Sequence, residues 1–105
     1  MVVTTDAVDG YRIKKVLGLV QGSSIRARHV GMDLTAMLKN ITGGEITEYT
    51  KLIAEAREQA LDRMRESAAQ VGANAVLGTR FVTASLMQGA SELLVYGTAA
   101  IIEAE

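Results

Sequence analysis

Few side chains in this 105-residue chain have the chemistry of a metal ligand or a nucleophile. The chain has no cysteine, one histidine and five methionines. The absence of cysteine excludes disulfides, thiolate nucleophiles, iron–sulfur clusters and cysteine-ligated zinc. His29 has one neighbour at ligand spacing, Asp33, and the two would share a face only if this segment were helical. We therefore expect no cofactor, and a metal ion stays open as an alternative. His29 remains the one candidate metal ligand, with a hydrogen-bonded histidine as the alternative.

Gly43 and Gly44 precede a long helical pattern and are candidates for binding an anion. Backbone N–H groups at the start of a helix can bind a phosphate or a carboxylate. Thr42 and Glu45, however, have the spacing of a capping box, in which the glutamate itself occupies that position. The chain has no Walker-type lysine and no glycine fingerprint after a strand. A turn is therefore the favoured interpretation, and anion binding stays open.

Four further residues are candidates for contacting a ligand: Tyr49, Arg57, Asn74 and Thr98. Arg57 borders the apolar side of the predicted helix, where an arginine either extends its charge into water or pairs with a carboxylate of a neighbouring subunit. Tyr49 is expected to be packed with its hydroxyl hydrogen-bonded. Asn74 is suited to a connector after the helix. Thr98 lies between two small residues, where strands or subunits can approach closely.

The chain offers little for catalysis. A Ser–His–Asp arrangement would have to combine His29 with a serine of the Ser23–Ser24 pair, and nothing in the sequence orients these residues. The carboxylates of Glu55, Glu58 and Asp62 recur at helical spacing, which is typical of a solvated charged face. We expect no catalytic residues and no enzymatic activity.

The glycines and Arg57 belong to a long predicted helix over Glu45–Val71. Its apolar residues recur at steps of three and four, as on one face of an α-helix: Ile46, Tyr49, Ile53, Ala56, Ala60, Met64, Ala68 and Val71. Charged residues follow the same rhythm on the opposite face. This pattern predicts an amphipathic helix with Ile53 buried against a sheet and Glu58 in water.

Three β-prone segments are predicted to form the sheet: Tyr11–Gln21, Ala75–Met87 and Glu92–Ile102. The last two flank a loop at 88–90 and form a hairpin, and Gly22 to Ser24 is expected to break the first. Asp33 is a suitable N-cap for a short extra helix over Leu34–Asn40. The expected fold class is α+β, in two layers, with the long helix packed on a small antiparallel sheet in one domain spanning residues 1–105.

The last strand shows a pattern that one chain does not explain. An antiparallel sheet with one solvated face alternates apolar and polar residues. The stretch from Leu93 to Ile102 does not alternate, so both of its faces are apolar. One face can meet the helix, and little of the chain is left to cover the other. A second copy of the protein is the economical cover, which predicts a homo-oligomer.

The charge balance restricts the other partners. The eleven basic and twelve acidic residues give a formal net charge of -1, which gives no reason to expect nucleic acid or an anionic membrane as a partner. No signal peptide is visible and no apolar run approaches the ~18 residues of a membrane span. We expect a cytoplasmic protein.

Several of these features together resemble one family. They are Thr4–Thr5, Gly43–Gly44, Tyr49, Arg57, Ala60, Met64, Ala68, the Gly72–Ala75 segment and the Gly97–Ala99 segment. In this order and spacing they resemble the YbjQ-like family, labelled heavy-metal-binding and largely uncharacterised. Ala100 stands where relatives usually have valine. The resemblance implies a small α+β, dodecin-like fold assembled as a ring-shaped pentamer, and it implies no defined activity.

The sequence leaves three functions open. The preferred one is a non-enzymatic cytoplasmic homo-oligomer that binds or sequesters a small ligand or a metal ion. In such a ring, His29 of several copies could build a metal site by symmetry. The second is a structural ring without a ligand. The third is an enzyme whose site is completed between subunits, which would need an ionisable side chain in an inter-subunit pocket.

Overall fold

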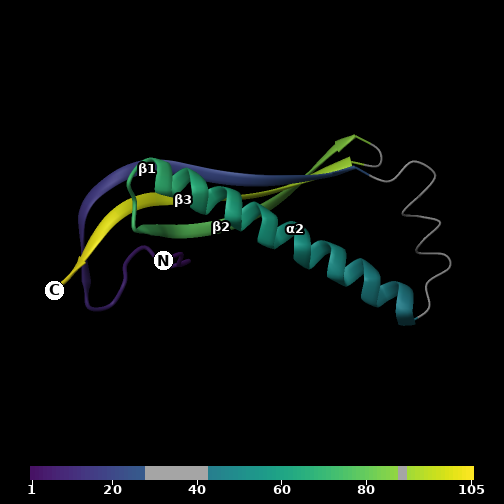
Figure 1. The fold of residues 1–105 in the computed structure, drawn as a ribbon, viewed down its shortest axis with the longest axis horizontal. Coiled ribbons are helices and arrows are strands. Elements are labelled where there is room, and N and C mark those ends of the chain that lie inside the picture. The colour runs from purple at the N-terminus through teal and green to yellow at the C-terminus, as the bar shows by residue number, and fades with distance from the viewer. Residues whose placement is uncertain (28–42, 88–89) are drawn as a thin grey trace.

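The computed structural model describes the backbone of residues 1–27, 43–87 and 90–105, and the side chains of residues 1–25, 51–85 and 91–105. It contains strand β1 (Tyr11–Ala27), helix α2 (Gly43–Gln70), strand β2 (Ala75–Met87) and strand β3 (Ala90–Ala104) (Figure 1). One helix packed on a three-stranded antiparallel sheet confirms the α+β class. The predicted short helix at 34–40 and His29 lie outside the described residues.

The sheet has the order β1-β3-β2, and both pairs are antiparallel. The bounds predicted for β2 match those observed, and β3 is longer at both ends than the predicted 92–102 segment. The predicted end of β1 at Gln21 is wrong, because the strand continues to Ala27, which pairs with Ala90. Gly22 therefore lies inside a strand and not in a break.

Gly22 is the point of closest approach between the helix and the sheet. A Cβ atom added at Gly22 would lie under 3.0 Å from the carbonyl oxygen of Ala60 and from the backbone nitrogen of Met64, closer than real Cβ atoms approach another heavy atom. Only a residue without a side chain lets the backbone of α2 rest directly on β1. The glycine that suggested a break in the sequence is thus a packing requirement of the two layers.

The main core lies between α2 and the sheet. Its buried members are Val20, Ala60, Met64, Ala68, Val76, Val95 and Ala99. The predicted apolar stripe of the helix is confirmed for Ala56, Ala60, Met64 and Ala68, which are all buried. The burial predicted for Ile53 and Val71 is wrong, since their side chains are 39% and 50% exposed. The first turns of α2 run past the sheet at an angle to it, so this part of the helix lacks a sheet beneath it (Figure 1).

A second, smaller core covers one end of the opposite sheet face. Ala75, Leu77, Ala100 and Ile102 are buried there, with Val3 and Val8 packed on them. The N-terminal segment is held along β2 by backbone hydrogen bonds, from Val3 N to Val76 O at 2.9 Å and from Gly78 N to Thr5 O at 2.8 Å. The chain therefore covers part of the face for which the sequence predicted only a second copy.

Candidate functional site

The sheet face turned away from α2 carries most of the exposed large hydrophobic side chains. Val95 and Ala99 are buried under the helix, so alternate residues of β3 such as Tyr96 and Thr98 point to the other side. The strand register extends this outer face to β1 and β2, because Leu19 is the partner of Thr98 and Val82 the partner of Leu94. The exposed hydrophobic residues of this face, here called the outer patch, are Ile13, Val16, Leu19, Ile25, Val82 and Tyr96.

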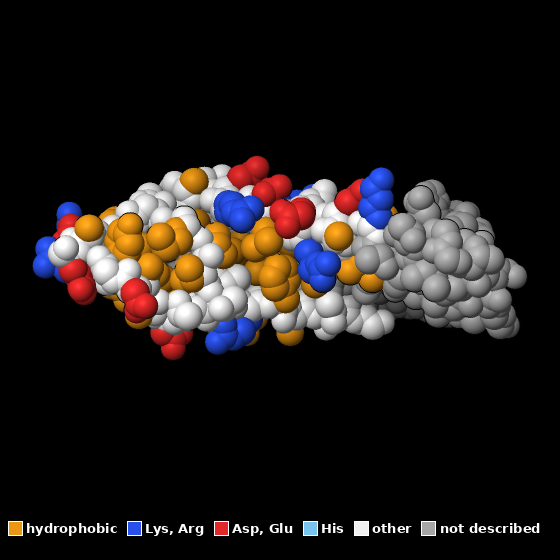
Figure 2. All heavy atoms as spheres, turned by 90° about the horizontal axis from the view of Figure 1, so that it is seen from below, with side chains coloured by type: hydrophobic (Ala, Val, Ile, Leu, Met, Phe, Trp, Pro, Cys, Tyr) orange, Lys and Arg blue, Asp and Glu red, His pale blue; other side chains and the backbone are white. Residues whose placement is uncertain are grey.

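The outer patch is unusually apolar for a surface in water. Leu19 is 71% exposed, Val16 59% and Ile25 58%. Six such side chains leave roughly 500 Å² of apolar surface, near the upper end for the largest patch on a monomeric protein. Figure 2 views the molecule from the edge of the sheet and not onto the outer face, and it shows hydrophobic side chains exposed along the described part of the molecule, with charged groups beside them. A surface of this kind is typical of an interface.

Three polar side chains interrupt the outer patch in one row across the sheet. Tyr96 of β3 is the register partner of Gln21 in β1 and of Arg80 in β2. Directly paired residues of neighbouring strands have Cβ atoms about 5 Å apart, so these three side chains start from neighbouring positions on one face. Gln21, Tyr96 and Arg80 are here called the polar row. Thr98 lies on the same face, two residues along β3 from Tyr96.

A β-bulge in β2 places Arg80 in this row. Leu77 pairs with Thr98 and Arg80 pairs with Tyr96, so Gly78 and Thr79 together stand opposite a single residue of β3. Gly78 has a φ of +61°, a left-handed conformation that L side chains rarely adopt. Without the extra residue, strict alternation from the outward-facing Leu77 would turn Arg80 toward α2. The bulge thus places the Arg80 side chain on the outer face.

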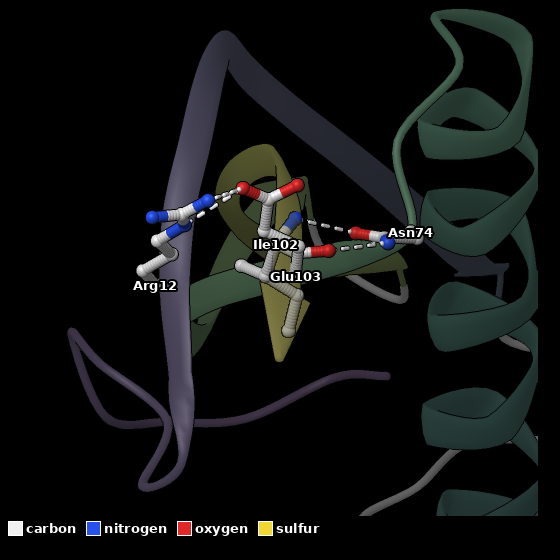
Figure 3. Close-up of polar contacts among 4 residues, drawn as sticks. All are labelled: Arg12, Asn74, Ile102 and Glu103. Carbon is white, nitrogen blue, oxygen red and sulfur yellow. Dashed lines mark hydrogen bonds and ion pairs between the residues drawn. The ribbon is translucent and has the colours of Figure 1, made fainter. Parts of the chain in front are cut away.

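The guanidinium of Arg80 is held by the backbone. Its Nη1 donates to the carbonyl oxygen of Thr4 at 2.8 Å and to that of Thr79 at 2.9 Å. Among the described residues Arg80 forms no ion pair, in contrast to Arg12, which pairs with Glu103 (Figure 3), and Arg65, which pairs with Asp62. The Arg80 guanidinium is therefore fixed in place without an ion-pair partner among the described residues, and the Asp6 carboxylate lies beside the neighbouring Gly78.

The residues predicted from the sequence to contact a ligand do not gather in one place. Gly43 and Gly44 are the first residues of α2, so the turn favoured for them is wrong and the helix begins before the predicted Glu45. The side chain of Tyr49 lies outside the described ones. Arg57 is exposed on α2, so the sheet separates it from the outer face. Thr98 alone lies on the outer face, exposed between Leu19 and Leu77.

Asn74 has a structural role. Its Nδ2 donates to the carbonyl oxygen of Ile102 at 2.9 Å, and its Oδ1 accepts from the backbone nitrogen of Ile102 at 2.8 Å (Figure 3). Its side-chain amide thus reproduces the hydrogen bonds of a strand residue and extends the sheet by one position beyond Ala75. The donor and the acceptor of the Asn74 amide are therefore both occupied by hydrogen bonds within the fold.

The polar row was not predicted from the sequence. Its signal is Arg80, a charged residue inside the otherwise apolar and small segment Ala75–Val82, two positions after a glycine. A glycine inside a strand suggests a bulge. The three members of the row are far apart in the chain, and only the register of two strand pairs brings them together.

The described residues do not provide a metal site. No group of three or more His, Asp or Glu side chains within them could hold an ion. Met64, the one described thioether on the helix stripe, is fully buried in the core. Within the same residues, no helix is long and apolar enough to cross a membrane.

Comparison with known proteins identifies the family. A family model described as "putative heavy-metal-binding" matches residues 1–103. The chain belongs to this YbjQ_1 family. It is 55% identical over 103 residues to a UPF0145 protein of Thermus thermophilus, covering 98% of this chain and 90% of that protein. A UPF0145 protein of Clostridioides difficile is 54% identical, with 98% and 92% covered. The resemblance seen in the sequence is confirmed.

A solved structure supports the same fold. A DUF74-family protein of unknown function from Pediococcus pentosaceus superposes with a TM-score of 0.64, covering 98% of this chain and 97% of that one, at 15% identity. The names of these YbjQ_1 relatives state no enzymatic activity. The described residues hold no group of three His, Asp or Glu side chains for the metal named in the family description, and His29 lies outside them.

Proposed function

We propose that this YbjQ_1 protein acts as a homo-oligomer whose copies bury their outer patches and bind a small ligand between them. The observation that carries the proposal is the apolar outer face of the sheet. A pentameric ring, implied by the family resemblance, is the form of oligomer that we propose. The cytoplasmic location remains a prediction from the sequence.

The composition of the outer patch favours a second copy over an unrelated transient partner. Transient interfaces are about as polar as the rest of a protein surface, whereas interfaces of permanent homo-oligomers are more apolar and poor in charge. The outer patch is dominated by aliphatic residues, with Arg80 and the half-buried Glu92 as the charged residues on the same face. This is the pattern of a permanent interface between copies.

A ligand between copies is supported by the polar row. Ligand sites are mostly apolar with a few convergent polar groups, and the outer patch with Gln21, Tyr96 and Arg80 has this composition. In a ring without a ligand, the fixed cation of Arg80 would lie unpaired in the interface, and an unpaired buried charge opposes assembly.

Analytical ultracentrifugation of the purified protein at micromolar concentration tests the assembly. We expect a single oligomeric species. Leu19→Lys should raise the concentration needed for assembly at least tenfold, because it places a second cation in the patch. Val71→Lys is the matched control, since Val71 is 50% exposed just after α2 and away from the outer face. A well-folded wild-type monomer at this concentration would refute the proposal.

A further inference from the structure

We infer that the polar row binds a small organic carboxylate, with the carboxylate on Arg80 and an apolar body lying on the outer patch. This inference rests on the proposed homo-oligomer, because burial of the outer patch is what makes a counter-charge necessary. It goes beyond the proposed function by naming the residues of the site and the chemical class of its ligand.

The donors of Arg80 are arranged for such a ligand. An arginine has five N–H donors, and the bonds of Arg80 to the carbonyl oxygens of Thr4 and Thr79 both use Nη1. Nε and Nη2 are then the donors that remain, and this pair matches the two oxygens of a carboxylate. Because the backbone already fixes Nη1, little side-chain entropy is lost when the ligand binds.

Assembly makes the anion necessary. A second copy on the outer patch would remove water from Arg80, and a desolvated charge without a partner strongly opposes binding. The ion pairs formed within the described residues are Arg12 with Glu103 and Arg65 with Asp62, so Arg80 has no ion-pair partner among them. A carboxylate on Arg80 removes this cost.

The neighbours set the rest of the ligand. The Tyr96 hydroxyl and the Gln21 side-chain amide can both donate hydrogen bonds, and both belong to residues paired in the same row. Leu19 and Val82 lie on the same face on either side of the row and are 71% and 46% exposed. Within the polar row, a monoanion balances the charge of Arg80, whereas a phosphate dianion would leave a net negative charge there. The site therefore favours a monocarboxylate with an apolar body.

Isothermal titration of the wild-type oligomer with benzoate tests the inference. We expect benzoate to bind, and benzyl alcohol, its uncharged analogue, to bind at least tenfold more weakly. Arg80→Gln should weaken benzoate binding at least tenfold, and Arg80→Lys should weaken it less, because it keeps the charge but loses the paired donors. Tyr96→Phe should weaken binding about threefold. Arg65→Gln, on the exposed side of α2, is the control and should change nothing.

Each contrary result has a distinct meaning when ultracentrifugation is run on the same samples. A wild-type monomer refutes the oligomer itself. An intact oligomer that does not bind benzoate, or that binds benzyl alcohol equally well, refutes the carboxylate site alone. Inorganic phosphate binding in place of benzoate, with the same dependence on Arg80, refutes the ligand class. If Glu92→Gln weakens assembly as much as Arg80→Gln does, the carboxylate that neutralises Arg80 belongs to Glu92 of a neighbouring copy and not to a ligand. This result would also overturn the inference.

Discussion

Replacing Gly22 by alanine tests how the two layers are held together. The added methyl group would lie under 3.0 Å from Ala60 O and Met64 N and 3.0 Å from the carbonyl carbon of Arg63. All three are backbone atoms of α2, so no side-chain rotation relieves the overlap. The helix would have to move away from β1 by a distance on the order of 1 Å, which forfeits a quarter to a half of the dispersion energy of the contacts it opens.

The cost follows from what lies beneath the helix. Ala60 and Met64 are 0% exposed and Val20 is 6% exposed, so separation opens contacts in the centre of the core. Overpacking costs ~1–3 kcal/mol where flexible side chains can adjust, and here backbone meets backbone. We expect Gly22→Ala to lower the free energy of unfolding by about 3 kcal/mol or more, a large part of the ~5–15 kcal/mol of a typical domain.

Urea titration followed by circular dichroism measures this loss, at one fixed protein concentration because an oligomer's stability depends on concentration. Gly18→Ala is the matched control on the same strand. A Cβ at Gly18 meets nothing within 4 Å, but its φ of +110° is unsuited to alanine, so about 1 kcal/mol should be lost. A loss at Gly22 equal to or smaller than that at Gly18 would refute the close approach of α2 to β1.

Two further predictions concern the helix and the connector that follows it. Met64→Ala should lower the free energy of unfolding by ~2–5 kcal/mol, because Met64 is fully buried. Ile53→Ala should lower the free energy of unfolding by less than about 1 kcal/mol, because Ile53 is 39% exposed. Urea titration measures both variants, and a larger loss for Ile53→Ala than for Met64→Ala would contradict the placement of α2. Asn74→Ala removes two hydrogen bonds to Ile102 and should cost ~1–3 kcal/mol. Hydrogen exchange should show faster exchange of the Ile102 amide, and an unchanged rate would contradict the assigned bond.

The sequence by itself determined the elements that depend on local pattern. The apolar residues at steps of three and four placed the buried stripe of α2 at Ala56, Ala60, Met64 and Ala68, because side chains that far apart share one face of any helix. The run of β-prone residues before the turn gave the bounds of β2 as Ala75–Met87. The doubly apolar pattern of β3 also indicated, correctly, that both faces of the sheet carry hydrophobic residues.

Only the tertiary structure decided which residues meet. Gly22 indicated a break in the sequence, and its actual role depends on the backbone of α2, some forty residues away. The bulge at Gly78 and Thr79 reverses the alternation of β2, so that counting residues from Leu77 would assign Arg80 to the wrong face. The polar row depends on the register of two strand pairs. Each of these facts is set by contacts between distant segments, whose geometry a local sequence pattern does not contain.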